Sequence, residues 1–354
     1  MAVDPDPYHA VHWQGARLSA RVASARARDT RRRRAALVDL ALDDDGRLSE
    51  RIRLTVIARL HDLVEGVARD LRHQAGLYME GEVAWRSPVA ATVERLRRAG
   101  LLADPELVTE LVAQLRQRLL ADALPTEALA SDGTSLLVRL AEAPDPNVSD
   151  AARAVLLAEG ASRAAGQGSV APCLPEALHR QLVWTVAAAL RDGDDPTLDR
   201  ALTLAADHLL AAQADGIRPD VAARRLAAAI DARAGELPDL LVESLSDRQL
   251  GLFIAFLARG TGIDDADMRD IVLEPEGDRL WLVLRALDMN RATLGRIGLA
   301  LSEADGARDI EGFADALDAI MTVTAEDARR ALAPLTLPRG FRDAIDRLDG
   351  AVRR

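Results

Sequence analysis

The chain offers few side chains for catalytic chemistry, and their spacing assembles no recognisable active site. It has six histidines and a single cysteine, Cys173, and all 45 of its basic residues are arginines. A lone cysteine excludes an intrachain disulfide and a thiolate zinc cluster, and the absence of lysine excludes a P-loop or Schiff-base lysine. His9 and His12 have the i, i+3 spacing of a metal-binding pair, but no carboxylate motif occupies that turn. The sequence therefore predicts no catalytic residue, no cofactor and no metal site.

His61 is the histidine with the most specific sequence context. It precedes Asp62 and Leu63, a pattern similar to the His-Asp-Leu of helical bundles that transfer phosphoryl groups through a histidine. A phosphoaccepting imidazole must face solvent to meet the aspartate of its partner. His61, however, lies between Ile57 and Val64 on an apolar stripe of its expected helix. We therefore expect His61 to be buried, and we keep histidine phosphotransfer as an alternative function.

Charge is concentrated in a segment near the N-terminus. Residues 17–34 contain eight arginines and one aspartate, a local balance of +7, whereas the whole chain has a formal net charge of -11, so the remainder carries -18. Such a patch can contact an acidic partner, an acidic membrane surface or nucleic acid. The acidic remainder and the lack of aromatic residues among the arginines disfavour nucleic acid. The candidate interaction residues are Arg17, Arg21, Arg26, Arg28, Arg31, Arg32, Arg33 and Arg34.

Two hypotheses describe this basic N-terminal arm, residues 1–34. In the first, the arm is flexible or solvated and serves association with a partner more than stability of the fold. Deleting it then leaves the thermal midpoint nearly unchanged and reduces any salt-sensitive association, because salt screens exposed charges. In the second, Leu18 and Val22 pack the arm as a structural helix against the helix that begins at Glu50. We expect the first.

Apolar side chains recur every three or four residues along almost the whole chain, which predicts helices throughout and essentially no sheet. Apolar residues make up 49% of the sequence and aromatic residues only 3%, enough for a sizeable aliphatic core. The clearest helix covers residues 49–74 and presents a stripe that runs from Val56 to Val67. Further helices are expected over 88–99, 105–121, 134–142, 148–164, 176–191, 197–213, 219–234, 237–244, 247–258, 265–273, 277–287, 290–302, 309–322, 325–332 and 339–349.

Capping residues and tryptophans add local detail. Residues 246–249, Ser-Asp-Arg-Gln, match a capping box, Asn290 suits an N-cap, and Pro219 suits a first helical turn. Trp184 and Trp281 lie in apolar helical stretches, so we expect both to pack in core layers.

The expected architecture is all-α: an irregular HEAT-like array of helix pairs, either an α-solenoid or a layered helical domain. No exact repeat period is present. A stretch rich in Gly, Ser, Ala and Pro at residues 161–175 predicts a linker between helical halves at 35–160 and 176–354. No apolar run reaches the length of a membrane span and no signal-peptide region opens the chain, so we expect a cytoplasmic protein.

Several segments resemble one family. Residues 174–191, residues 87–89 with 101–108, and residues 250–287 are similar to helices of the bacterial domain of unknown function 2336. The resemblance implies an all-helical, HEAT-like protein of undetermined activity and assigns no functional residues. Together with the lack of assembled catalytic groups, it favours a non-enzymatic protein-interaction or regulatory scaffold. We expect its partner to be another protein or a second copy of the chain.

Overall fold

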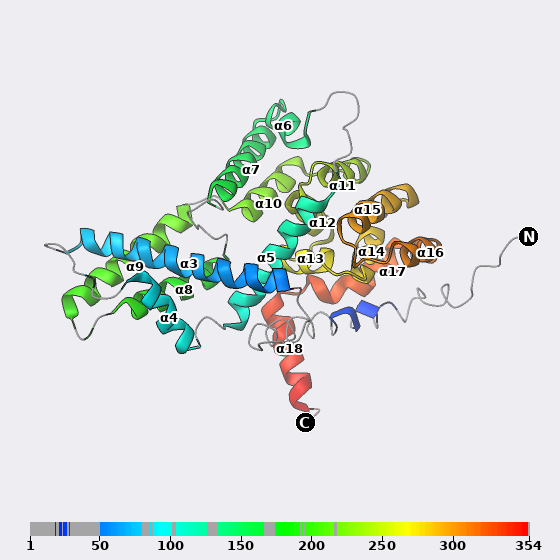
Figure 1. The fold of residues 1–354 in the computed structure, drawn as a ribbon. Coiled ribbons are helices and arrows are strands. Elements are labelled where there is room, and N and C mark those ends of the chain that lie inside the picture. The colour runs from blue at the N-terminus through cyan, green and yellow to red at the C-terminus, as the bar shows by residue number, and fades with distance from the viewer. Residues whose placement is uncertain are drawn as a thin grey trace, which may run out of the picture. The chain divides into compact units, whose positions relative to one another are not determined.

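A computed structural model of the protein consists of α-helices (Figure 1). Among the residues that it describes, helices account for well over half and no strand occurs, which confirms the all-α prediction. None of these helices has both the length and the apolar character needed to cross a lipid bilayer. The HEAT-like arrangement of helix pairs stays a prediction. The described residues are 18, 21, 22, 24–26, 28, 50–79, 85, 88–100, 104–125, 134–165, 174–191, 193, 195–215 and 218–352.

The helices begin and end within a few residues of their predicted positions, because apolar spacing, prolines and caps are local features of the sequence. In chain order they are α3 (Glu50–Leu77), α4 (Val89–Arg98), α5 (Pro105–Ala123), α6 (Leu136–Ala141), α7 (Pro146–Ala165), α8 (Glu176–Leu190), α9 (Pro196–Asp215), α10 (Pro219–Ile230), α11 (Leu237–Ser246), α12 (Leu250–Thr261), α13 (Asp265–Val272), α14 (Asp278–Ala286), α15 (Arg291–Ala304), α16 (Ile310–Met321), α17 (Ala325–Leu332), the 3₁₀ helix η3 (Ala333–Thr336) and α18 (Arg339–Val352).

The helices fall into two compact units, neither of which is one continuous stretch of chain. Unit 1 comprises residues 1–31, 116–155 and 220–354, and unit 2 comprises residues 32–115 and 156–219. This division differs from the consecutive halves expected on either side of residues 161–175. Unit 2 combines helices from both sides of that stretch, because α3 packs against α8 and α9.

The core of unit 2 forms where α3 packs against α4, α8 and α9 (Figure 1). The predicted stripe of α3 from Val56 to Val67 is buried. A second apolar face of α3 is buried from Val64 onward, but Leu54, one end of that face, is 55% exposed. Neighbouring helices therefore cover the C-terminal part of α3 on two sides and its N-terminal part on one.

The core of unit 1 is built around α12 and α14. Every residue from Leu252 to Ala258 is buried, so α12 is enclosed on all sides. Trp281 of α14 is buried and lies 4.3 Å from Phe313 of α16 between ring centroids, which confirms its predicted core position. Gly298 of α15 lies against the same phenyl ring, where a Cβ would overlap it. The corresponding prediction for Trp184 in unit 2 was wrong, since its side chain is 38% exposed.

Candidate interaction site

The described residues of the N-terminal arm are helical and belong to unit 1. Leu18, Val22 and Ala25 follow each other at i, i+4 and i+7 and are 1%, 4% and 0% exposed. Side chains at this spacing share one face of a helix, so the apolar face of this arm segment, residues 18–28, is covered. The packed alternative, and not a solvated arm, describes these residues. A role of the arm in association stays a prediction.

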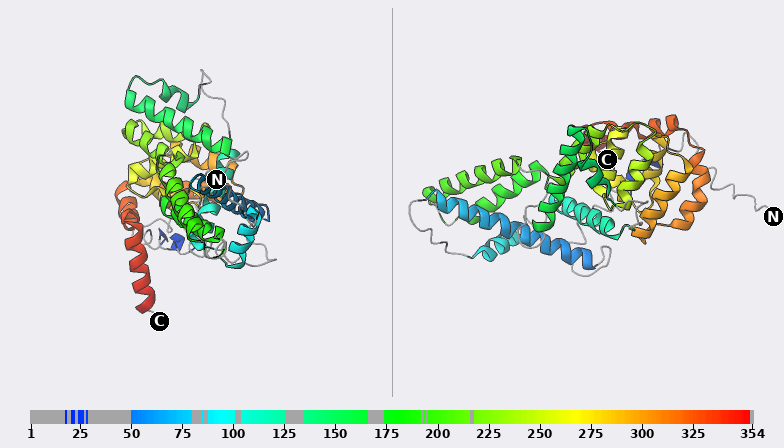
Figure 2. Two further views of the ribbon diagram at one scale, coloured as in Figure 1. Left: turned by 90° about the vertical axis from the view of Figure 1, so that its left-hand side faces the viewer. Right: turned by 90° about the horizontal axis from the view of Figure 1, so that it is seen from above.

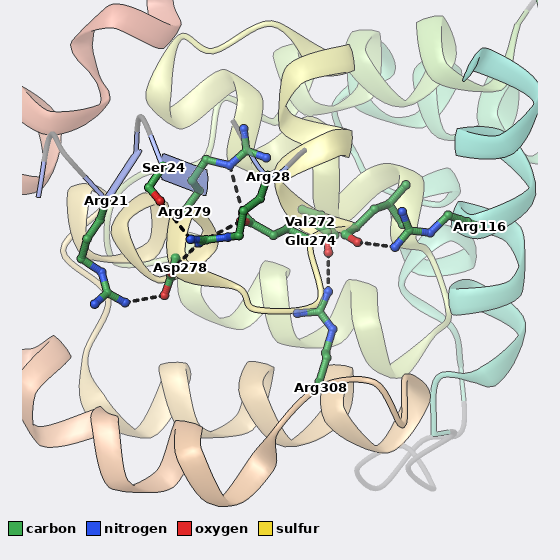
Figure 3. Close-up of polar contacts among 10 residues, drawn as sticks. Arg21, Ser24, Arg28, Arg116, Val272, Glu274, Asp278, Arg279 and Arg308 are labelled. Carbon is green, nitrogen blue, oxygen red and sulfur yellow. Dashed lines mark hydrogen bonds and ion pairs between the residues drawn. The ribbon is translucent and has the colours of Figure 1, made fainter. Parts of the chain in front are cut away.

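Two arginines of the arm segment bind one carboxylate (Figure 3). Arg21 donates from Nη2 to Asp278 Oδ1 at 2.6 Å, and Arg28 donates from Nη2 to Asp278 Oδ2 at 2.9 Å. Arg28 also donates to the Ser24 hydroxyl one helical turn earlier, at 3.1 Å, which orients its guanidinium. Asp278 is 19% exposed, so these charge-assisted bonds are partly shielded from water. The arm thus contacts α14, whereas the packed hypothesis had placed it on α3.

Asp278 is positioned by the turn that joins α13 to α14. It lies in the first turn of α14, where the partial positive charge of the helix N-terminus favours a carboxylate. The preceding residue, Gly277, has a φ of 68° in the left-handed region. A Cβ at this position would also lie 3.0 Å from the Trp281 ring. Glycine meets both requirements, and Asp278 is held at the surface of the core by the buried indole beneath the turn.

Glu274 lies in the same turn and is buried, with a side chain only 1% exposed. Its Oε2 accepts a hydrogen bond of 2.9 Å from Arg279 Nε, and its Oε1 lies 4.0 Å from Arg28 Nη2. Burial raises the pKa of the Glu274 carboxyl, and the neighbouring Arg279 opposes that shift. Glu274 therefore extends the acidic surface inward beneath the arm segment.

Two further arginines hold the backbone of this turn (Figure 3). Arg116 of α5 donates to the Leu273 carbonyl at 2.8 Å, and Arg308 donates to the Val272 carbonyl at 2.5 Å. The last carbonyls of a helix lack intrahelical partners, so these bonds satisfy the C-terminal end of α13. Burial lowers the pKa of the Arg308 guanidinium. The turn with Glu274 and Asp278, which we call the acidic turn (residues 273–278), is thus also held by two arginines that do not belong to the arm.

The structure describes only some of the remaining residues that the sequence proposed for a site. Arg26 is helical and half-buried, whereas Arg17 and Arg31–Arg34 lie outside the described residues, as do His9, His12 and Cys173. Among the residues that the structure describes, no group of three or more His, Cys, Asp or Glu side chains is arranged to hold a metal ion. The acidic turn itself was missed by our sequence reasoning. The sequence pattern that could have indicated this turn is the set of three acidic residues at 274, 276 and 278 around a glycine.

The prediction that His61 is buried was wrong. His61 is exposed on α3, next to the exposed Asp62. The cause is the partial coverage of α3: the apolar face shared by Leu54, His61 and Val64 is covered only from Val64 onward. His179, by contrast, is buried in α8, and burial lowers the pKa of its imidazole.

The comparison with known families concerns mainly unit 1. The family described as "uncharacterised protein conserved in bacteria (DUF2336)" matches residues 126–333, more than half of the chain. The chain belongs to this family. The acidic turn lies inside the matched region of this DUF2336 protein, whereas the arm segment, His61 and α18 lie outside it. No curated protein and no solved structure matches the chain.

Proposed function

We propose that this DUF2336 protein is a non-enzymatic interaction module, in which unit 1 binds an arginine-bearing amphipathic helix at the acidic turn. The observation that carries the proposal is the convergence of Arg21 and Arg28 on Asp278 beside a covered apolar face. Buried apolar side chains supply most of the affinity of a helix for a groove, and charge pairs select its orientation. In this chain the arm segment occupies the site.

Occupancy by the chain's own arm gives the site a regulatory character. A tethered segment binds at a high effective concentration, so a partner helix must compete with the arm. Displacement releases the arm, whose arginines then become available for other contacts. The pairing of Arg21 and Arg28 with carboxylates favours a protein partner over a membrane or nucleic acid for this segment.

The test separates the arm from the chain without deleting it. A protease site is inserted after residue 40, the purified protein is cleaved, and retention of the arm fragment is measured by size exclusion. We expect the fragment to stay bound and to exchange with a labelled peptide of residues 15–30. Asp278→Asn should weaken retention by about tenfold or more, an effect of ~1.4 kcal/mol.

Asp315→Asn on α16 is the matched control, since Asp315 is exposed and lies outside the acidic turn. A peptide in which Leu18 and Val22 are both replaced by Asp controls for the apolar face. Immediate loss of the fragment from the unsubstituted protein, or equal retention by the Asp278→Asn and Asp315→Asn variants, would overturn the proposal.

A second candidate function, histidine phosphotransfer, rests on the exposure of His61 in unit 2. The exposed imidazole is accessible to an aspartyl phosphate on a receiver domain. An imidazole nitrogen would attack phosphorus, the aspartate carboxylate would leave, and the imidazole proton would pass to solvent. The test incubates the chain with a phosphorylated receiver domain and measures acid-labile label on the chain. His61→Gln should abolish that label, while His208→Gln, a change at an exposed histidine of α9, should not.

A further inference from the structure

The arm segment carries a serine beside the two arginines that bind the acidic turn. Ser24 is exposed and lies in the arm segment, the short blue segment in Figures 1 and 2. Among the described residues of the arm it alone has a hydroxyl group. At 100° per residue, Ser24 lies about 40° around the helix from Arg28 and about 60° from Arg21, farther from the covered apolar face than either arginine. A charge placed on this hydroxyl is therefore one helical turn from both arginines.

The Ser24 hydroxyl already takes part in the contact between the arm and the acidic turn (Figure 3). It accepts a hydrogen bond of 3.1 Å from Arg28 Nη1, while Nη2 of the same guanidinium donates to Asp278 Oδ2 at 2.9 Å. The guanidinium thus bridges the serine oxygen and the carboxylate that anchors the arm. A negative group on the serine oxygen competes with Asp278 for this guanidinium.

The residues before Ser24 are typical of a serine that protein kinases modify. Arg21 lies three positions before the hydroxyl, and kinases select their substrates by the pattern of charges around the acceptor. We propose that Ser24 is a phosphorylation site and that its phosphate releases the arm from the acidic turn. This inference rests on the proposed function, because it requires that the arm occupies the binding site of unit 1.

The modification is a phosphoryl transfer from a nucleoside triphosphate, catalysed by a serine kinase that recognises arginine. The Ser24 oxygen forms a bond to the γ-phosphorus, while the bond from that phosphorus to its bridging oxygen breaks. The nucleoside diphosphate leaves, and the hydroxyl proton passes to the base of the kinase. Val22 and Ala25, on either side of the acceptor, are 4% and 0% exposed in the docked arm. A kinase that binds these neighbours acts while the arm is released, and the phosphate then keeps it released.

Electrostatics determine the direction of the effect. A phosphoserine carries about -1.5 to -2 charges at neutral pH and accepts strong hydrogen bonds from arginine. Residues 18–28 contain three arginines and no acidic residue, so the phosphate cancels at least half of the positive charge of the segment. Its attraction to the arginines of the arm acts within one helix and persists when the arm leaves. Its repulsion from Asp278 and Glu274 acts only while the arm is docked, so phosphorylation favours the released arm.

The first experiment measures the effect of the phosphate by peptide exchange. The cleaved chain that retains its arm fragment is titrated with two peptides of residues 15–30, one unmodified and one with phosphoserine at position 24. We expect the phosphopeptide to need a concentration about tenfold higher, or more, to displace half of the fragment. The difference should shrink as salt rises, because salt screens the repulsion. Equal displacement by the two peptides would overturn this inference and leave the proposed function intact, whereas displacement by neither would overturn both.

The same titration on the Asp278→Asn chain locates the effect. Without the carboxylate the phosphate meets less repulsion, so the ratio between the two peptide concentrations should fall toward one. Asp315→Asn, at the exposed position on α16, should keep the full ratio. A ratio that Asp278→Asn leaves unchanged would mean that the phosphate acts on the helix of the peptide itself, which contradicts the release mechanism.

The last experiment tests whether the serine accepts phosphate in the full chain. The protein is incubated with the catalytic domain of an arginine-directed serine kinase and a labelled nucleoside triphosphate, and mass spectrometry identifies the labelled residue. We expect label on Ser24 and faster labelling of Asp278→Asn, because its arm is released more often. Arg21→Ala should slow labelling although it also weakens docking, because the kinase loses the arginine that it recognises. No label on Ser24, or a labelling rate that Asp278→Asn leaves unchanged, would overturn the proposal.

Discussion

The two terminal segments of unit 1 carry the same apolar spacing and have opposite surroundings. Leu18, Val22 and Ala25 of the arm segment are covered, whereas the three apolar residues of α18 at the identical i, i+4, i+7 spacing, from Phe341 to Leu348, are exposed. Spacing therefore predicts that a segment is an amphipathic helix, but not whether its own chain supplies the surface that the helix needs.

Charge accounts for part of the difference. The arm segment has two arginines directed at one carboxylate in a fixed turn, Asp278, while the described side chains of α18 make one such contact, between Arg342 and Asp267. Two anchoring points across the arm fix its orientation, whereas the single contact of α18 holds only its first turn. The following substitutions test whether the covered arm segment also contributes more to the free energy of unfolding than the exposed face of α18 does.

The largest expected effect is that of truncating the buried leucine of the arm. Leu18→Ala should lower the free energy of unfolding by about 2–5 kcal/mol, because it removes buried methyl groups and leaves a cavity. This reverses the sequence-based expectation that the arm contributes little to stability. Urea denaturation followed by tryptophan fluorescence measures the loss, with Trp281 as the buried reporter in unit 1. A loss below about 0.5 kcal/mol would restore the picture of a solvated arm.

Removing the charge that the arm binds should have a smaller effect. Asp278→Asn should lower the free energy of unfolding by about 1–2 kcal/mol. The lower end applies because the side chains of Arg21 and Arg28 are 25% and 31% exposed, so solvent screens part of the attraction. The loss should shrink as salt rises in chemical denaturation with urea. Asp315→Asn should change stability by less than about 0.5 kcal/mol at any salt concentration.

The boundaries of the helices could be predicted because they depend on neighbouring residues. Asn290 caps α15 as predicted, with its side chain accepting from the Thr293 amide at 2.9 Å. The capping box expected at residues 246–249 was wrong. There α11 ends at Ser246 and α12 begins at Leu250, because Arg248 takes a φ of 59° between them. The left-handed backbone conformation of Arg248 is set by tertiary packing, and no local sequence pattern indicates it.

Only one side of the candidate site, the arginines of the arm, could be predicted from the sequence. The arginines of the arm were visible as a charge run, but their partner Asp278 lies about 250 positions away in the sequence. Nothing local relates two such segments, since their contact depends on how α13 and α14 pack. The prediction that His61 is buried was wrong for the same reason. The spacing within its own helix indicated an apolar face, but whether that face is covered depends on helices far along the chain.

Acidity offers a finer test of the arm's site, through the buried Glu274. Burial raises the pKa of this carboxyl above its usual 4.5, so the folded state binds its proton more tightly than the unfolded state. The stability from this proton is present below pH 4.5 and is lost as pH rises through the folded pKa. Glu274→Gln removes that loss, so the stability of the variant relative to the unsubstituted protein should increase across this interval and then level off.

Thermal denaturation at a series of pH values measures this difference. Glu311→Gln, at an exposed glutamate in the first turn of α16, serves as the control and should keep the profile of the unsubstituted protein. A Glu274→Gln profile parallel to that of the unsubstituted protein would contradict the assigned direction.

The smallest effect on stability is expected at α18. At low micromolar concentration Leu348→Ala should change the free energy of unfolding by less than about 0.5 kcal/mol, because the leucine is exposed in the single chain. Urea denaturation of both variants measures the contrast, and Leu18→Ala serves as the comparison because Leu18 is buried within one chain. If Leu348→Ala instead destabilised the dilute protein as much as Leu18→Ala does, α18 would be packed within its own chain and the contrast between the two segments would disappear.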